Sequence, residues 1–329
     1  MRTNALLALV VSLTLPGCGF AWRAFKRNLA APPERTVAHK IVDPRRPRAR
    51  LAALWVGHAT VLLQLDDRFV LTDPLFAHTL AQASPRLVEP GLDVANVPPL
   101  SAVVVSHMHF DHLSFSSLDL LEQRTPVVLV PPGMRANMPR YSFEIRELKS
   151  WASYEQDGLR VTAVPVQHVG GRYGLDAAFE TRAFTGYVFE YHGLSVYFGG
   201  DTAFIPSAFQ ATRARFPTLS LALLPICPDA PRDFMQYTHE SPGQALDAFA
   251  LLGARRMIPI HFDTYINSDD APGACANELR AGMQARGLND DQVSILAIGE
   301  QRVLIADGPP PAKPSAHNDS PPLASERQR

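Results

Sequence analysis

A cluster of three histidines and one aspartate constrains this chain more than any other feature of its sequence. The residues are His107, His109, Asp111 and His112, and they follow the apolar run 102–105, which is typical of a buried strand. A lone histidine at a strand end usually makes a structural hydrogen bond, but four such groups buried without partners would cost several kcal/mol. Imidazole and carboxylate groups are ligands that zinc prefers, and iron or manganese accept the same donors. The cluster therefore predicts a metal site where a buried strand opens into a loop.

The folded unit is expected to span residues 51–306. We expect strands at 54–56, 60–65, 69–72, 102–105, 127–130, 160–164, 186–190, 195–198, 219–224, 257–260 and 303–305, and helices at 116–123, 242–252 and 274–284. Asp66 and Asp67 are expected to form a hairpin turn, and Ser241 followed by Pro242 marks a helix start. Many strands with interspersed helices favour an α/β fold in which two sheets carry helices on their outer faces.

The H-x-H-x-D-H pattern after an apolar strand resembles the signature of the metallo-β-lactamase superfamily, and the resemblance covers residues 51–306. It implies a four-layer αββα sandwich with two divalent metal ions, most commonly Zn²⁺, with Fe or Mn as alternatives. Three further ligands occur in the order that the superfamily requires. The resemblance implies that one metal is held by His107, His109 and His168, that the second is held by Asp111, His112 and His261, and that Asp201 bridges both.

A narrower resemblance concerns several separated motifs. They are similar to the bacterial relatives of N-acyl-phosphatidylethanolamine-hydrolysing phospholipase D, and they lie at 55–60, 71–74, 167–168 and 231–239. The resemblance implies a zinc-dependent phosphodiesterase that acts on phospholipids of this kind through a metal-bound hydroxide, which Asp111 orients. The products would be a lipid like phosphatidic acid and an alcohol. Departures from the family pattern, which bear on the substrate rather than on the metals, occur at Ser114, Val169, Asp263 and 172–184.

Three further residues have both a functional and a structural interpretation. Asp73 precedes Pro74 at a strand end, and the resemblance implies that it accepts a hydrogen bond from a ligand imidazole and supports catalysis; otherwise it begins a turn. His239 matches a family histidine that contacts the phosphate or the leaving group; otherwise it is a surface histidine beside a helix. His58 either supports the metal ligands or is simply buried beside Trp55.

Two other functions stay open at this point. One is hydrolysis of carboxylic bonds by the same fold, as in a lactonase, with a β-lactamase less favoured by the narrower motifs. The other is a non-catalytic envelope protein that retains the fold, although no ligand position is lost. The net charge of −1 gives no electrostatic footprint for nucleic acid, so we expect no such partner. Fold resemblance does not by itself settle the substrate.

The N-terminal segment predicts export. Arg2 precedes the uncharged apolar stretch 5–15, which is shorter than the roughly 20 residues that a spanning helix needs. The run from Leu15 to Cys18 resembles a bacterial lipobox, which implies a signal peptide over 1–18 and lipidation of Cys18. An ordinary signal peptide cleaved near Gly17 or Gly19 and a cytosolic protein are the alternatives. The absence of aspartate after Cys18 favours an outer-membrane lipoprotein that faces the periplasm.

Two terminal segments are expected to lie outside the fold. Residues 19–50 carry nine basic side chains against two acidic ones and several prolines, which predicts a basic tether, either solvated or in contact with anionic head groups. Residues 307–329 contain almost no large apolar side chains and are expected to be disordered. Cys227 and Cys275 are candidates for a disulfide in an oxidising compartment, but the sequence does not set their distance.

Overall fold

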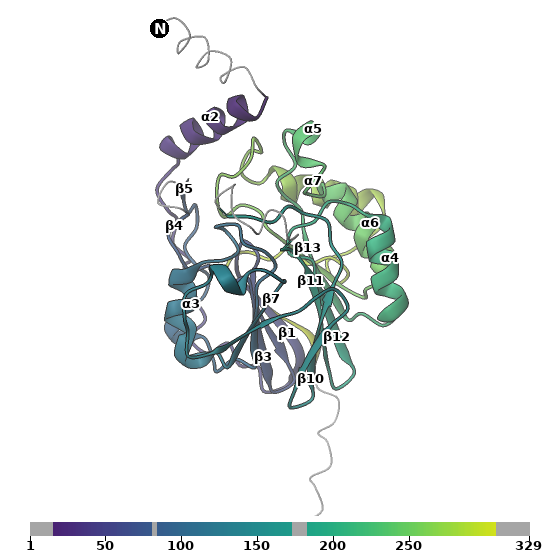
Figure 1. Ribbon diagram of the computed structural model, residues 1–329. Helices are drawn as coiled ribbons and strands as arrows, with labels where there is room; N and C mark the ends of the chain where they lie inside the picture. Colours follow the sequence, from purple (N-terminus) through teal and green to yellow (C-terminus); the bar gives the residue numbers. More distant parts are fainter. Residues whose placement is uncertain (1–15, 81–83, 173–182, 307–329) are drawn as a thin grey trace, which may run out of the picture.

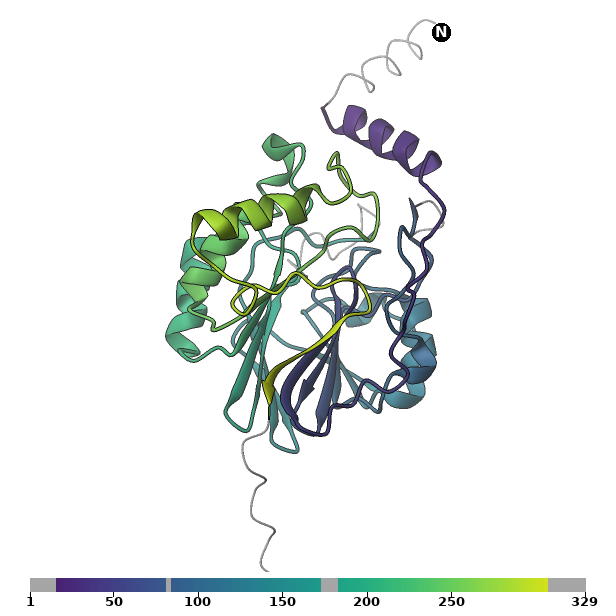
Figure 2. The same ribbon diagram turned by 180° about the vertical axis from the view of Figure 1, so that it is seen from behind.

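The computed structural model describes residues 16–80, 84–172 and 183–306. The expected disordered tail at 307–329 and most of the expected signal peptide lie outside these described residues. The structure is a mixed α/β sandwich in which two sheets pack face to face and helices cover their outer faces (Figure 1, Figure 2). It has the four-layer αββα arrangement that the sequence resemblance implies.

The first sheet contains seven strands in the order β15-β1-β2-β3-β6-β7-β8. Their bounds are β1 (Ala49–Gly57), β2 (Thr60–Leu65), β3 (Arg68–Thr72), β6 (Ala102–Val104), β7 (Val127–Val130), β8 (Glu144–Glu147) and β15 (Gln301–Ala306). Strands β3, β6, β7 and β8 are parallel to one another, whereas β15, β1, β2 and β3 form antiparallel pairs. Because β1 and β3 are each antiparallel to β2, β1, β3 and β6 all end at the same edge of the sheet.

The second sheet contains six strands in the order β14-β13-β12-β11-β10-β9. Their bounds are β9 (Ser153–Gln156), β10 (Leu159–Val164), β11 (Gly186–Tyr191), β12 (Leu194–Phe198), β13 (Leu221–Pro225) and β14 (Met257–Ile260). Strands β12, β13 and β14 are parallel, and β10 runs in the same direction because both β10 and β12 are antiparallel to β11. A separate short hairpin pairs β4 (Thr79–Leu80) with β5 (Ser84–Pro85).

The helices form the outer layers. They are α2 (Pro16–Leu29), α3 (Phe115–Leu121), α4 (Pro206–Arg215), α5 (Arg232–Met235), α6 (Pro242–Leu252) and α7 (Ala274–Ala285), with short 3₁₀ turns η1 (Val94–Asn96), η2 (Glu122–Arg124) and η3 (Arg135–Asn137). Helix α3 covers the first sheet, and α4, α6 and α7 lie on the outer side of the second (Figure 1). In the described residues, no helix combines the length and the apolar character needed to cross a membrane.

Strand β1 shows how both faces of the first sheet become buried. Leu51, Ala53 and Trp55 belong to the core between the two sheets, whereas Leu54 and Val56 belong to the core beneath α3. Side chains alternate between the two faces of a strand, so a strand with two buried faces needs apolar residues at every position. This explains why the strands read as continuous apolar runs in the sequence.

All the expected strands and helices are present, with bounds that differ by a few residues. Helix α6 has the expected start: the Ser241 hydroxyl accepts from the Gln244 amide at 3.2 Å, and Gln244 Oε1 accepts from the Ser241 amide at 3.2 Å. The sequence analysis missed β4, β5, β8, β9, α2, α4 and α5. Cys227 and Cys275 form a disulfide, with their Cα atoms 6.1 Å apart.

Residues 19–50, which the sequence predicts to be a basic tether, contact the folded unit in the part that the structure describes. Helix α2 ends at Leu29, before the first prolines of the segment, and Arg23 forms an ion pair with Asp269 at 2.7 Å. Farther along, Arg35 pairs with Val88 in a β-bridge, and Lys40 contacts Glu89 at 2.8 Å. The segment therefore packs along the folded unit. The domain limits at 18 and 50 stay predictions.

Candidate metal centre

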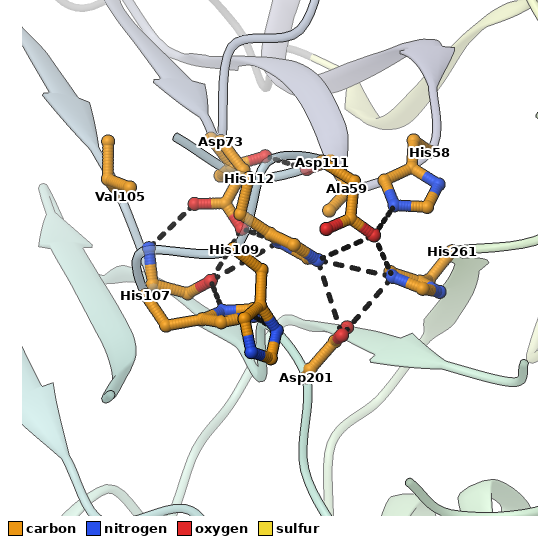
Figure 3. A network of polar contacts seen from close by, with 12 residues as sticks. His58, Ala59, Asp73, Val105, His107, His109, Asp111, His112, Asp201 and His261 are labelled. Atoms are coloured by element: carbon orange, nitrogen blue, oxygen red, sulfur yellow. Dashed lines mark hydrogen bonds and ion pairs between the residues drawn. The ribbon is translucent and has the colours of Figure 1, made fainter. Parts of the chain in front are cut away.

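The candidate ligands lie beyond strand ends that share one edge of the sandwich. Asp73 follows β3 and the loop 105–112 follows β6 in the first sheet, whereas His168 follows β10, Asp201 follows β12 and His261 follows β14 in the second. Because these strands run in the same direction, their carboxyl ends bring together side chains that lie far apart in the sequence. Figure 3 shows several of them pointing toward one centre.

The first group consists of His107, His109 and His168. Nδ1 of His109 lies 2.8 Å from Nε2 of His107 and 3.3 Å from Nε2 of His168. Two nitrogens bound to one tetrahedral zinc ion at 2.0–2.1 Å would be about 3.3 Å apart. The spacing of this group is therefore close to that of three ligands around one cation.

The second group consists of His58, Asp111, His112 and His261, whose ligand atoms all lie within 4.8 Å of one another. Nε2 of His261 lies 3.1 Å from Nε2 of His112. Asp201 lies between the two groups: its Oδ2 is 3.2 Å from Nε2 of both His112 and His261 and 3.8 Å from Nε2 of His168. The structure thus brings together all seven residues named from the sequence, with Asp201 close to imidazoles of both groups.

Contacts on the far side of three imidazoles set which ring nitrogen faces the centre. Nδ1 of His112 donates to Asp73 Oδ2 at 2.6 Å, and Nδ1 of His168 donates to the Thr238 carbonyl oxygen at 2.8 Å. Nδ1 of His107 lies 2.9 Å from the Ser106 hydroxyl, which itself donates to Asp73. A metal-bound form of each ring would carry its proton on Nδ1, with the lone pair of Nε2 directed inward.

Asp73 makes the contact that the sequence analysis expected, with a ligand imidazole. Its Oδ1 also accepts from the Ser106 amide at 2.6 Å, and its Oδ2 accepts from the Ser106 hydroxyl at 2.6 Å. The side chain is fully buried. Asp73 therefore holds His112 and Ser106 in position and does not merely begin a turn.

His58 contacts two candidate ligands of the second group, Asp111 and His261. Its Nε2 lies 3.0 Å from Asp111 Oδ2, and its ring centroid lies 3.8 Å from that of His261. It also lies beside Trp55, whose indole nitrogen donates to the His58 carbonyl oxygen at 2.9 Å. His58, Asp73 and His261 have positive φ angles of 55°, 33° and 64°, which are uncommon for residues with a side chain and cluster at functional sites.

His239 lies at the rim of the site, not on the outer surface beside a helix. Its Nδ1 is 3.7 Å from Asp201 Oδ2, and its ring centroid is 5.0 Å from that of His168. Burial lowers the pKa of His239 to about 4, although Asp201 acts in the opposite direction. The side chain also lines a cavity of about 450 Å³ together with residues of both ligand groups.

The buried charges and lone pairs of the cluster fit divalent cations. Burial lowers the pKa of both His107 and His168 well below the ordinary value, which leaves neutral ligand imidazoles. Burial opposes the charge of Asp201, but His112 and His261 outweigh it and hold its pKa well below the ordinary value. Oδ1 of Asp201 is buried and makes no hydrogen bond within the described part of the chain. Cations between these groups would offset the repulsion of converging lone pairs and satisfy this oxygen.

The sequence analysis missed two residues that shape the centre. Ser106 links Asp73 to His107, and its only signal in the sequence is its place before the histidine cluster. Gly200 has a φ of 58°, and a Cβ atom there would lie 2.4 Å from the Ser106 Cβ atom. Gly200 therefore allows the Asp201 loop to approach the Ser106 backbone closely.

The positions that depart from the family pattern have separate places. Ser114 caps α3 by accepting from the Ser117 amide, and Asp263 accepts from the Gly273 amide at 2.7 Å. Val169 is partly exposed and lines the cavity. Arg172 donates to the carbonyl oxygens of Met108 and Leu113, so it braces the loop of the histidine cluster. The rest of this divergent region, 173–182, lies outside the described residues.

Comparisons with known proteins agree with this geometry. A family model described as "Beta-lactamase superfamily domain" matches residues 68–262, a range that includes all seven candidate ligands. The N-acyl-phosphatidylethanolamine-hydrolyzing phospholipase D 1 of Caenorhabditis elegans is 32% identical in an alignment of 239 residues that covers 68% of this chain and 67% of that protein. A UPF0173 metal-dependent hydrolase of Pelotomaculum thermopropionicum is 26% identical over 251 residues, which are 76% of this chain and 98% of that protein.

Solved structures support the fold. The metallo hydrolase Igni18 of Ignicoccus hospitalis superimposes with a TM-score of 0.57 at 19% identity, over 77% of this chain and 97% of that one. The phospholipase relationship is distant in sequence, whereas the match of the family model spans more than half of the chain. The chain therefore belongs to the beta-lactamase superfamily, as a metal-dependent hydrolase of the metallo-β-lactamase fold.

Proposed function

We propose that this protein is a dinuclear zinc hydrolase that cleaves phosphodiester bonds in phospholipids such as N-acyl-phosphatidylethanolamine. The observation that carries the proposal is the character of the cavity above the ligand groups. One wall is formed by site residues, which are His109, Asp111, His168, Asp201, His239 and His261. Its apolar rim includes the exposed Val169, Phe234 and Tyr237, and the buried Met235 also lines the cavity.

A phospholipid has the same division between polar and apolar parts. Its phosphate would lie against the imidazole and carboxylate wall, and its acyl chains would contact the apolar rim. Phe234 and Tyr237 are 51% and 70% exposed and line the same cavity, and neighbouring exposed apolar side chains can mark a ligand or membrane contact. The printed name of the Caenorhabditis elegans relative supports this choice of substrate.

The residues divide the work as follows. Divalent cations held by the seven ligands would supply Lewis acidity, which lowers the pKa of water and offsets charge on phosphate oxygens. Asp111, held by His58 at 3.0 Å, orients the attacking water molecule. Asp73 keeps the His112 ring in place. His239, at the rim, contacts a phosphate oxygen or the leaving group.

Hydrolysis assays test the reaction class. The purified protein is given bis(p-nitrophenyl) phosphate, N-acyl-phosphatidylethanolamine and an N-acyl-homoserine lactone, each with and without a chelator. We expect both phosphodiesters to be hydrolysed, the chelator to abolish turnover, and zinc to restore it. Turnover of the lactone alone would replace the proposal with a carboxylic-bond hydrolase. A protein that binds metal and turns over no substrate would agree with a non-catalytic envelope protein.

We also propose that Cys18 is lipidated and anchors the enzyme to the outer membrane, facing the periplasm. The lipobox-like run before Cys18 supports this proposal, and an anchor would place the cavity beside phospholipids. The Cys18→Ala variant should be released from membranes more readily than the wild type and should carry no acyl chain by mass spectrometry. An unmodified wild-type Cys18 would contradict the proposal.

A further inference from the structure

Helix α2 docks onto the folded unit through its polar side. Arg23 donates to Asp269 Oδ2 from Nε at 3.0 Å and from Nη2 at 2.7 Å. Arg27 donates to the carbonyl oxygens of Ser268 and Asp270, and Asn28 Nδ2 donates to the Ile266 carbonyl oxygen at 3.1 Å. At about 100° per residue, Arg23, Arg27 and Asn28 occupy one side of the helix. The loop 266–270 receives all of these contacts.

The opposite side of α2 is apolar and faces outward. Trp22, Phe25 and Leu29 are 51%, 50% and 73% exposed, and their spacing places them on one face. The Trp22 and Phe25 rings stack with centroids 5.7 Å apart, and the Lys26 ammonium lies 5.1 Å from the Trp22 ring. A helix on a soluble protein normally buries its apolar side, so this reversed orientation leaves an apolar face without cover in the described structure.

We propose that this face of α2 lies in the interfacial region of a bilayer that contains anionic lipids. Tryptophan and lysine side chains are favoured at the boundary between head groups and acyl chains. Lys26 borders the apolar face and can meet anionic head groups. The helix is too short to span a bilayer and suits a position in the membrane plane.

The same arrangement directs the cavity toward the bilayer. Helix α2 and helix α5, which carries Phe234, lie at the same end of the molecule in both views (Figure 1, Figure 2). The loop that holds α2 also braces the cavity rim, because Asp270 accepts from the Asp229 amide at 2.9 Å and Asn267 lines the cavity. Docking through α2 therefore sets the cavity mouth against the membrane surface. This inference does not depend on which bond the enzyme cleaves.

Vesicle binding by the chain from residue 18 onward, with Cys18→Ser, tests the inference, since neither the signal peptide nor an acyl chain then tethers the protein. The vesicles contain phosphatidylethanolamine and phosphatidylglycerol, and cosedimentation measures the bound fraction. We expect the triple change Trp22→Ser, Phe25→Ser and Leu29→Ser to weaken binding at least about tenfold. The matched control changes three exposed apolar residues elsewhere to serine, namely Val42, Leu120 and Val303. The control should bind like its parent.

Quenching by lipids with brominated acyl chains locates α2 directly. Trp22 fluorescence should be quenched, with the Trp22→Phe protein giving the remaining signal of the other two tryptophans. Unchanged vesicle binding by the triple variant, an equal loss in the control, or no quenching of Trp22 would overturn the inference. So would a dimer in solution that the triple variant abolishes, since a second copy would then cover the face. Hydrolysis of a soluble phosphodiester should be the same in all variants, which separates this test from that of the proposed reaction.

Discussion

The Asp73 carboxylate holds the His112 imidazole through a 2.6 Å contact between Oδ2 and Nδ1, and both side chains are fully buried. This contact leaves Nε2 of His112 directed at Asp201, 3.2 Å away. Asp73 comes from the end of β3 and His112 from the loop after β6. The pairing of these two parallel strands therefore determines the direction of one candidate metal ligand.

Asp73→Asn should weaken metal binding without unfolding the protein. The amide keeps the shape of the carboxylate but loses the charge that fixes the His112 tautomer, so we expect affinity to fall about 10–100-fold and added zinc to restore part of the activity. Competition with a chromogenic chelator measures the affinity. Asp157→Asn is the control, because Asp157 is exposed and also has a positive φ, of 50°. Equal zinc affinities in the two variants would show that Asp73 does not contribute to metal binding through His112.

Gly200→Ala should destabilise the fold more than Gly193→Ala. Both residues have positive φ angles, of 58° and 78°, but a Cβ atom at Gly193 meets nothing within 4 Å, whereas one at Gly200 meets the Ser106 Cβ at 2.4 Å. The shared backbone cost is about 1–2 kcal/mol, and the clash should add about 1–3 kcal/mol at Gly200. Urea unfolding measures the difference. If both variants lose the same stability, the Asp201 loop does not depend on this close approach.

His239→Ala should keep both metals and lose turnover. The imidazole lies at the cavity rim, 3.7 Å from Asp201, and we assign it to the substrate. Elemental analysis and phosphodiester hydrolysis are measured together, with His192→Ala as the control because His192 is exposed and belongs to the turn between β11 and β12. Loss of metal would make His239 a ligand. If His239→Ala keeps its full metal content and full activity, His239 has only a structural role.

Replacing Cys227 and Cys275 by serine should lower stability in an oxidising buffer. The disulfide closes a separation of 48 residues, and such a crosslink contributes about 2–4 kcal/mol. The free energy of unfolding is compared with and without a reducing agent. Wild type under reducing conditions should match the serine variant, and a difference that persists there would mean that the substitutions act through packing.

Much of the fold and the site could be predicted because the signals are local. Residues 102–112 hold both an apolar strand and four ligand side chains, and the remaining ligands each follow a recognisable apolar run. Strands buried on both faces can be recognised by their continuous apolar sequence, as in β1.

The rest depends on contacts between distant residues. The pair Arg23 and Asp269 is separated by 246 residues, so the composition of the basic segment suggested a tether where the structure has a docked helix. Ser106 is an ordinary residue in the sequence, and only the pairing of β3 with β6 places it against Asp73. The disulfide likewise required the distance between Cys227 and Cys275, which the sequence does not contain.

The central claim is that seven side chains hold two metal ions and that Asp201 belongs to both sites. The most direct measurement is the zinc content per chain after equilibrium dialysis, determined for the wild type, Asp201→Ala and the exposed control Asp157→Ala. We predict two zinc ions in the wild type and in the control, and loss of both ions in Asp201→Ala because its carboxylate adjoins both ligand groups. At most one zinc ion in the wild type, or two retained by Asp201→Ala, would contradict the account.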